Sequence, residues 1–225
     1  MRIAITRLPD KGGDDAGRCA RFGHECYPVS PLRAEVTPAA IEAFTADLAA
    51  GRFDGLFFTS ALPAELVGPR VAASERPLRV VAIGPATRAA LARHGVAAEV
   101  LSSYYSRDFV PHLGPWLRGK TIGIPRADVP NEPLLAAIRA AGGEPVEYRI
   151  YRLIPTGEPL DLADADAVLF TSANSFSEAV WRRRPGLLVC AIGDVTADRM
   201  REAGVEPDAV GDGSLEGALR AIGGR

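Results

Sequence analysis

Residues 82–88 read Ala-Ile-Gly-Pro-Ala-Thr-Arg, and residues 191–197 repeat this pattern as Ala-Ile-Gly-Asp-Val-Thr-Ala. Each stretch follows a matching strand end, Leu-Phe-Phe-Thr-Ser-Ala at residues 56–61 and Val-Leu-Phe-Thr-Ser-Ala at residues 168–173. The spacing is nearly constant, because 112 positions separate Phe58 from Phe170 and 109 separate Gly84 from Gly193. This duplicated unit of strand, turn and helix predicts two similar lobes with a ligand cleft between them.

Short apolar runs alternate with helical patterns along the chain, which is typical of a parallel sheet built from β-α-β units. Runs such as Leu56-Phe57-Phe58 lack polar alternation, as expected of strands that helices cover on both faces. The predicted fold class is therefore α/β, with two similar lobes that each hold a parallel β-sheet flanked by helices. We expect strands at residues 2–6, 25–29, 55–59, 79–83, 99–101, 120–124, 146–151, 167–171, 187–192 and 208–210.

Capping residues and glycines indicate where the helices begin and end. The expected helices are residues 38–50 after Thr37, 107–116 after Ser106, 134–141, and 215–222 after Ser214. Two extended segments with few helix formers, near residues 28–36 and 147–155, are expected to pair as a two-stranded linker. The predicted domains are then a discontinuous lobe 1, residues 1–33 plus 153–225, and lobe 2, residues 34–152. Each lobe has on the order of 100 residues, a common domain size.

Composition excludes several classes of protein. The net charge of −2 gives no basic field that would attract nucleic acid, and no apolar run approaches the roughly 20 residues of a membrane-spanning helix. The N-terminus enters a strand without a signal-peptide apolar region, which predicts a cytoplasmic protein. The three cysteines are an odd, scattered set without metal-ligand spacing. Cys190 lies in the apolar run 187–192 and is predicted to be buried.

Hydroxyl residues and glycines stand where four predicted strands end. Helix N-termini at the carboxyl edge of a parallel sheet offer amide donors and a positive dipole end, which favour anions. Each loop alone is equally well explained by ordinary helix capping, but four loops in two registered copies favour a site that binds a polyanion through main-chain donors. The candidates are Thr59, Ser60, Gly84, Thr87, Thr171, Ser172, Ala173, Asn174, Ser175, Gly193 and Thr196.

Two arginines and one tyrosine are further candidates. Arg7 and Arg126 are expected on loops just past the first strand of each copy, either forking a substrate carboxylate or solvated. Strand alternation places Tyr151 on the same face as Arg149, where it either donates a proton into the cleft or packs the hinge. Tyr104-Tyr105 is interpreted as a loop packing pair. No nucleotide fingerprint, Ser/His/Asp grouping or zinc motif is present.

In the order, spacing and duplication of these motifs, the chain resembles the uroporphyrinogen-III synthase family over nearly its whole length. The resemblance rests on residues 5–7, 58–60, 82–87, 148–152, 170–175 and 191–196. It implies cyclisation of the linear tetrapyrrole hydroxymethylbilane to uroporphyrinogen III, with loss of water and inversion of the last pyrrole ring. It also implies a monomeric enzyme that acts on a small-molecule substrate without a metal or organic cofactor. Transient contact with the upstream bilane-forming enzyme is a further expectation.

The resemblance also assigns roles to particular residues. Tyr151 aligns with the family's cleft tyrosine, the candidate acid, and Thr196 with a ligand-side threonine. Residues 172–175 align with main-chain donors of the first lobe. Asp194 departs from the pattern of some relatives and would repel carboxylates if it faced the cleft. We expect the second copy, with Asn174, Ser175 and Thr196, to face the chemistry.

Two alternative functions are also compatible with the sequence. A two-lobe binding protein for a small anion explains the repeat and the cleft equally well, although the motif order and the lack of a signal peptide count against it. A regulatory domain derived from such a synthase is the other, but no helix-turn-helix segment accompanies it. Assay of the product isomer distinguishes these alternatives.

Overall fold

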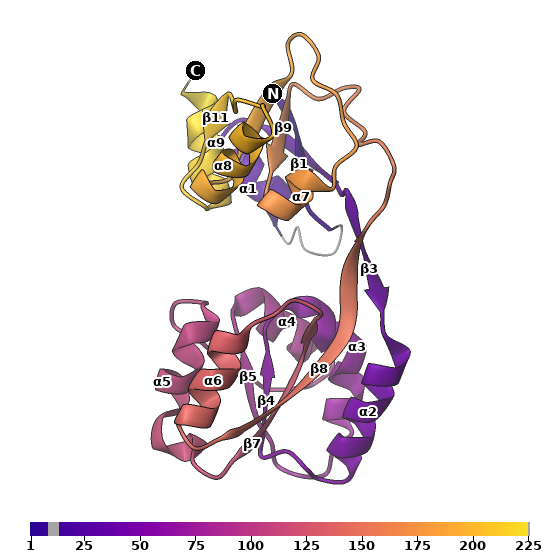
Figure 1. Cartoon of the computed structure of the whole chain (residues 1–225), viewed down its shortest axis with the longest axis vertical. Coiled ribbons are helices and arrows are strands. Elements are labelled where there is room, and N and C mark those ends of the chain that lie inside the picture. The colour runs from indigo at the N-terminus through magenta and orange to yellow at the C-terminus, as the bar shows by residue number, and fades with distance from the viewer. Residues whose placement is uncertain (9–13, 225) are drawn as a thin grey trace. The chain divides into compact units, whose positions relative to one another are not determined.

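The chain divides into two compact units in the computed structural model, which describes residues 1–8 and 14–224 (Figure 1). Unit 1 comprises Met1–Arg33 and Ile154–Arg225, and unit 2 comprises Ala34–Leu153. Each unit has its own sheet and its own pair of hydrophobic clusters. Both units therefore have the predicted α/β architecture.

Unit 1 contains a five-stranded sheet in the order β11-β10-β9-β1-β2, in which every neighbouring pair is parallel. Four helices accompany the described strands of this unit. The strands are β1 (Arg2–Thr6), β2 (Glu25–Val29), β9 (Ala167–Phe170), β10 (Leu188–Ala191) and β11 (Ala209–Val210). The helices are α1 (Asp15–Arg21), α7 (Ala173–Ser177), α8 (Asp194–Glu202) and α9 (Leu215–Gly223).

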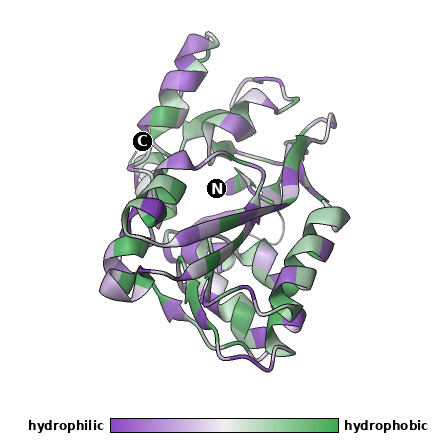
Figure 2. Ribbon diagram, turned by 60° about the horizontal axis from the view of Figure 1, so that its bottom comes forward, coloured by the Kyte–Doolittle hydropathy of each residue, from purple (hydrophilic) through white to green (hydrophobic). Residues whose placement is uncertain are grey.

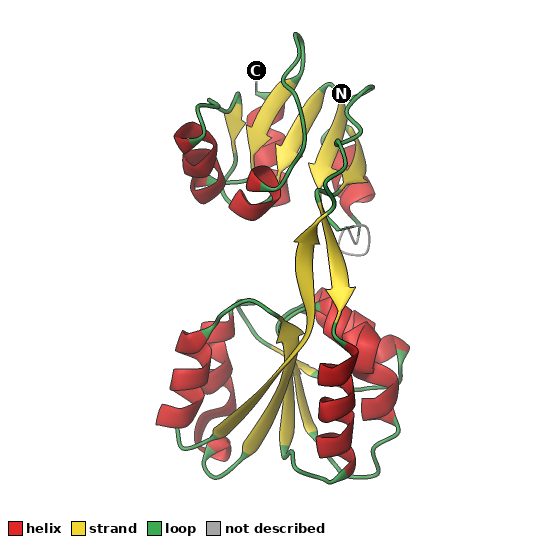
Figure 3. Ribbon diagram, turned by 45° about the vertical axis from the view of Figure 1, so that its right-hand side comes forward, coloured by secondary structure: helices red, strands yellow, loops and turns green. Residues whose placement is uncertain are grey.

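Unit 2 contains a six-stranded sheet in the order β3-β8-β7-β4-β5-β6, with helices on both sides of it (Figure 3). Its strands are β3 (Leu32–Val36), β4 (Gly55–Phe58), β5 (Arg79–Ala82), β6 (Glu99–Val100), β7 (Thr121–Ala127) and β8 (Glu144–Pro155). Its helices are α2 (Pro38–Ala49), α3 (Ala61–Ala72), α4 (Pro85–Arg93), α5 (Phe109–Leu113) and α6 (Glu132–Ala140), with 3₁₀ turns η2 (Ser106–Asp108) and η3 (Gly114–Leu117).

The two sheets confirm the duplication. The order β6-β5-β4-β7-β8 in unit 2 corresponds strand for strand to β11-β10-β9-β1-β2 in unit 1. Unit 2 adds β3, which neighbours β8 as the linker prediction required, and the arrows of these two strands point in opposite directions (Figure 3). The Ile150 carbonyl accepts a hydrogen bond from the Thr37 amide at the end of β3.

Alternate residues of the central strands enter cores on opposite faces of each sheet. In β4, Leu56 and Phe58 belong to one hydrophobic cluster and Phe57 to the other. In β1, Ala4 faces one cluster, whereas Ile3 and Ile5 face the other. Strands buried on both faces explain why the apolar runs lack polar alternation. The helices carry hydrophobic and hydrophilic residues in succession along the chain, as helices that cover a sheet do (Figure 2).

The local predictions hold for most elements, with one clear difference between Ser106 and Trp116. Asn131 and Ser214 accept amide hydrogen bonds as N-caps of α6 and α9, and Pro38 opens α2. The single helix expected between Ser106 and Trp116 is instead a 3₁₀ turn, a short helix and a second 3₁₀ turn. The break falls at Gly114, whose φ of 55° suits a glycine and ends the helical path.

Candidate functional site

The predicted site residues of each unit gather at the carboxyl edge of its sheet. In unit 2, Thr59-Ser60 follows β4 and Gly84–Thr87 follows β5. In unit 1, residues 171–175 follow β9, Gly193–Thr196 follows β10, and Arg7 follows β1. Because the strands that these residues follow pair in parallel with one another, their ends share one edge of each sheet. Arg126 is the exception, since it lies within β7.

In unit 1, the hydroxyls at this edge bond to one another and to the backbone. Thr6 Oγ1 lies 3.0 Å from Ser175 Oγ and 3.2 Å from the Leu169 carbonyl, and it accepts a hydrogen bond from the Thr171 amide at 3.0 Å. The Thr171 hydroxyl donates to the Thr6 carbonyl. Thr6 and Ser175 are both buried. These bonds tie β1 to β9 and leave the hydroxyls occupied.

Ser172 and Ser175 form a capping box at the start of α7. The Ser172 hydroxyl accepts from the Ser175 amide at 3.0 Å, and the Ser175 hydroxyl accepts from the Ser172 amide at 3.1 Å. The capping interpretation therefore describes both side chains. The amides of Ala173 and Asn174 occupy the first helical positions, which lack intrahelical partners by geometry.

Ser60 occupies the matching position in unit 2 but behaves differently. It precedes α3 as the N-cap residue, yet its side chain makes no capping hydrogen bond. Its Oγ instead lies 3.3 Å from the Tyr151 hydroxyl, 91 residues further along the chain. The hydroxyls of the equivalent serines therefore have different partners, the Tyr151 phenol in unit 2 and the Ser175 backbone amide in unit 1.

Tyr151 is buried, with only 1% of its surface exposed, and it packs in the hydrophobic cluster of α2, α3 and β4. The predicted alternation, which put Tyr151 on the face of Arg149, is wrong. The pairing of β7 with β8 shifts between Arg126 and Ala127, so Arg126 faces Arg149 but Ala127 faces Tyr151. This irregularity inserts one extra residue in β8. Consequently, Ile150 and Tyr151 are both buried while Arg149 and Arg152 are exposed.

Thr87 and Thr196 occupy matching third positions of two nine-residue helices, α4 and α8. Each residue is 3% exposed. Among residues 1–8 and 14–224, neither hydroxyl has a hydrogen-bond partner. Gly84 and Gly193 are the N-caps of these helices. Both helix starts thus combine unshared amides with a hydroxyl that no neighbouring group uses.

The helix starts differ in charge and in what lies beside them. Helix α8 begins with the exposed Asp194, whose carboxylate opposes anion binding there, whereas α4 begins with Pro85. A Cβ at Gly193 would lie 3.0 Å from the backbone nitrogen of Gly213, so the glycine permits a close approach of two loops. At Gly84, the three atoms nearest to a Cβ would all belong to the Tyr104 side chain, the first at 3.6 Å.

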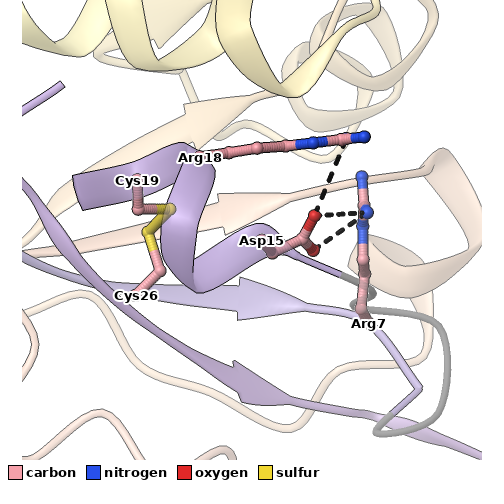
Figure 4. Close-up of a disulfide and its surroundings, with 5 residues drawn as sticks. All are labelled: Arg7, Asp15, Arg18, Cys19 and Cys26. Atoms are coloured by element: carbon pink, nitrogen blue, oxygen red, sulfur yellow. Dashed lines mark hydrogen bonds and ion pairs between the residues drawn. A yellow bond between two sulfur atoms is a disulfide. The ribbon is translucent and has the colours of Figure 1, made fainter. Parts of the chain in front are cut away.

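Arg7 and Arg126 already have carboxylate partners within their units. Arg7 Nη1 contacts both Asp15 oxygens, at 2.9 and 3.1 Å, and Arg18 also approaches Asp15 (Figure 4). Burial raises the pKa of the Asp15 carboxyl, although both arginines act to lower it. Arg126 is buried in β7 and contacts Glu147 at 2.9 Å and the Val129 carbonyl. The predicted loop position of Arg126 is therefore wrong, because β7 extends to Ala127.

A disulfide joins Cys19 in α1 to Cys26 in β2, beside the Arg7–Asp15 pair (Figure 4). This pairing is not predicted by the sequence, since an odd cysteine count fixes no partners. Cys190 is buried, as predicted. Among the described residues, no group of three His, Cys, Asp or Glu side chains is arranged to hold a metal ion, and no helix is long and apolar enough to cross a membrane.

Each of the two α/β units thus has a donor-rich carboxyl edge, and together they define a duplicated, two-unit α/β protein. The family model described as uroporphyrinogen-III synthase HemD matches residues 14–221, so the chain belongs to that family. This match supports synthase function and does not favour the binding-protein alternative. No curated protein matches.

Two solved structures share the fold. The chain is similar to uroporphyrinogen-III synthetase from Helicobacter pylori, with a TM-score of 0.62, 16% identity and full coverage of both chains. It is also similar to a mutant uroporphyrinogen III synthase from the extremely thermophilic bacterium Thermus thermophilus, with a TM-score of 0.58, 20% identity and full coverage of both chains. The two-unit α/β fold predicted from the repeat is confirmed.

Proposed function

We propose that this protein cyclises hydroxymethylbilane to uroporphyrinogen III, with loss of water and inversion of the terminal pyrrole ring, and is therefore a hydro-lyase. The family match over residues 14–221 carries this proposal. The substrate implied by the family bears eight carboxylates, and the two carboxyl edges are rich in amide and hydroxyl donors. Hydrogen bonds from such donors to carboxylates are charge-assisted and stronger than neutral ones.

The proposed acid is Tyr151, acting through Ser60. Tyr151 is almost wholly buried in unit 2, and its hydroxyl lies 3.3 Å from Ser60 Oγ, which is partly exposed at the sheet edge. A buried phenol reaches a bound substrate only through a neighbouring group. Ser60 suits this task because a hydroxyl donates and accepts at once, and because its side chain is not engaged in capping α3.

The proton transfer balances without a cofactor. Ser60 donates its proton to the terminal hydroxyl oxygen of the substrate while Tyr151 donates its own proton to Ser60. The bond from that oxygen to carbon breaks, water leaves, and the pyrrole nitrogen supplies electrons to the carbon. Ring closure releases a proton that restores the tyrosine. A positioned general acid contributes about 10²–10⁴ in rate.

The proposed carboxylate-binding groups are the edge donors that remain available. In unit 2 these are Thr59 and the segment Gly84–Thr87, and in unit 1 they are the amides of residues 173–174 and the segment Gly193–Thr196. The capping box and the Thr6 network engage Thr171, Ser172 and Ser175 internally, so we assign them to positioning the α7 amides. Arg7 and Arg126 are internally paired, which argues against direct carboxylate binding by either.

We further propose that residues 1–33 plus 153–225 and residues 34–152 fold as separate domains, each with its own core. We also propose that the enzyme is monomeric and cytoplasmic and that its substrate is a small molecule, in keeping with its family and its net charge of −2. The protein partner that we propose is the bilane-forming enzyme, through transient contact. The long β8 strand and its neighbour β3 would then serve as the connection.

The decisive assay adds freshly prepared hydroxymethylbilane and separates the product isomers by chromatography. We expect the type III isomer, formed faster than the spontaneous cyclisation. Only type I product, at the rate seen in buffer, would overturn the proposed function. Purified protein can be analysed by gel filtration for the monomer.

The roles of Tyr151 and Ser60 are tested with three variants. Tyr151→Phe is expected to lower kcat about 10²- to 10⁴-fold. Ser60→Ala should lower kcat comparably, because it removes the hydroxyl that passes the same proton from Tyr151 to the substrate. Tyr148→Phe, which removes the other buried phenol of β8, serves as the matched control with kcat near wild type, because the Tyr148 hydroxyl bonds to Asp47 and not to Ser60. An unchanged kcat in Tyr151→Phe would exclude this tyrosine as the acid.

A further inference from the structure

Two exposed tyrosines stand on an anchored loop at the carboxyl edge of the unit 2 sheet. The loop after β6 is fixed at one end by Leu101, which is fully buried, and at the other by Phe109, whose ring stacks on Phe57 at 4.1 Å. Between these anchors, Tyr104 and Tyr105 are 55% and 57% exposed. The predicted loop packing pair is therefore wrong, because more than half of the surface of each tyrosine is exposed although the loop itself is well anchored.

Tyr104 adopts an unfavourable backbone conformation. Its φ of 62° is the one positive value at a non-glycine among residues 1–8 and 14–224. Bulky residues reach this region at a cost, and such strain tends to mark functional positions. The conformation brings the ring of Tyr104 against Gly84, where a Cβ would lie 3.6 Å from two ring carbons. The tyrosine thus borders the start of α4, one of the proposed carboxylate-binding segments.

A cation completes this surface. The Arg107 guanidinium lies 4.5 Å from the centre of the Tyr105 ring. Within the described part of the chain, no carboxylate lies within 4.0 Å of it, unlike Arg79, Arg149 or Arg183. A guanidinium stacked on a ring keeps its in-plane N–H groups available for a carboxylate. The edge therefore offers aromatic faces and an uncompensated positive charge together.

The equivalent loop of unit 1 has neither feature. Strand β11 corresponds to β6 in the sheet order, and the residues after it read Gly-Asp-Gly at 211–213. There the backbone of Gly213 itself packs against Gly193. The same fold is thus completed without tyrosines or arginine. The aromatic loop of unit 2 is not a requirement of the architecture.

We propose that Tyr104, Tyr105 and Arg107 bind one pyrrole ring of the substrate together with its carboxylate side chain. The proposal rests on the proposed function and adds contacts that the repeat motifs do not include. Pyrrole rings are flat and electron-rich, so they stack on tyrosine rings, and each carries acidic side chains within reach of a neighbouring guanidinium. This proposal also implies that unit 2 binds the substrate more strongly than unit 1. Helix α4 of unit 2 begins with Pro85, whereas α8 of unit 1 begins with an aspartate.

The test uses Tyr104→Asn and Arg107→Gln in the full-length protein. Asparagine tolerates positive φ, so this variant removes the ring without disturbing the loop. We expect KM for hydroxymethylbilane to rise about 2- to 10-fold in each variant, with kcat unchanged, as loss of uniform binding predicts. The thermal midpoint of Tyr104→Asn should be equal to or above that of the wild type. The rise in KM for Arg107→Gln should shrink as ionic strength increases.

Arg139→Gln is the matched control, because Arg139 lies in the last turn of α6 and its loss changes the net charge equally. If the wild type is active and both Tyr104→Asn and Arg107→Gln keep the wild-type KM, the proposed pyrrole-binding surface is rejected while the proposed function stands. If the wild type makes only type I product, the proposed function fails. The binding surface is then tested separately by titrating each protein with uroporphyrin I and following fluorescence. Weaker uroporphyrin binding by both variants supports the surface, and equal binding rejects it.

Discussion

The buried ion pair between Arg126 and Glu147 allows a quantitative test of whether Arg126 is structural. Arg126 Nη1 lies 2.9 Å from Glu147 Oε1, with side chains only 7% and 13% exposed. The Nε atom of Arg126 is buried without a partner. In Glu147→Ala, the Val129 carbonyl would be the one hydrogen-bond partner left to the guanidinium among the residues that the structure describes. Stranding one charge of a buried pair typically costs about 3–5 kcal/mol, a large share of a typical unfolding free energy of about 5–15 kcal/mol.

The compensating variant separates burial cost from function. Arg126→Met combined with Glu147→Met replaces the pair by apolar groups, a change that is often neutral or stabilising by about 1–4 kcal/mol. The fold should therefore recover in the double variant. If Arg126 only supports β7 and β8, the double variant also keeps the wild-type KM. A folded double variant with a much higher KM would instead show that Arg126 binds substrate.

The assay is urea unfolding followed by tryptophan fluorescence in a Trp181→Phe background. Trp116 then reports unit 2 alone, since Trp181 packs on Phe170 and Phe176 in unit 1. A Glu147→Ala loss below about 1 kcal/mol would refute the reasoning, because it would place the pair in the range of exposed salt bridges. A double variant as unstable as Glu147→Ala would refute it equally, because no unpaired charge would remain to explain the loss.

Three further outcomes are expected. Ser172→Ala should lower the unfolding free energy by about 1 kcal/mol through loss of the capping box, whereas Ser60→Ala, which removes no cap, should cost less; equal losses in urea titration would contradict this. Reduction of the Cys19–Cys26 bond, which closes a loop with a separation of 7 residues, should destabilise unit 1 by about 2–3 kcal/mol; identical melts with and without reductant would exclude it. Hydrogen bonding from the Thr121 amide lowers the pKa of the Asp54 carboxyl, so the unfolded state binds the proton more tightly and stability falls as pH drops below about 4 through the folded-state pKa. Asp54→Asn should flatten this acid limb, and an unchanged limb would argue against it.

The sequence predicted the elements whose causes are local. Strand positions agree closely with the structure where apolar runs such as 55–58 and 167–170 fill doubly covered sheets. Helix starts after Asn131 and Ser214 follow from side-chain capping within three residues. The duplication predicted two equivalent sheets, and their strand orders match. Hydrophobic periodicity, helix caps and repeats depend on residues that are close in the sequence, so they can be predicted from the sequence alone.

The site is different, because its contacts join distant parts of the chain. Ser60 and Ser172 both stand in a Phe-Thr-Ser-Ala sequence, yet one meets a phenol 91 residues away and the other caps its own helix. The missing cap at Ser60 has a local cause, because the third helical position there is Pro63, which has no amide N–H, whereas Ser175 fills it after Ser172. The phenol partner has no local cause, because long-range packing brings Tyr151 to Ser60. One extra residue in β8 directs the Tyr151 side chain into the hydrophobic core, which simple strand alternation does not predict.

The sequence by itself therefore determined the duplicated α/β fold, its caps and the edges at which donors gather. Only the tertiary structure decided which donors remain available, because strand register and the β8 irregularity select the partners. It paired Arg126 with Glu147 and set Tyr104 against Gly84. Hydrogen-bond partners depend on geometry at the ångström scale, which long-range packing sets and local pattern does not encode.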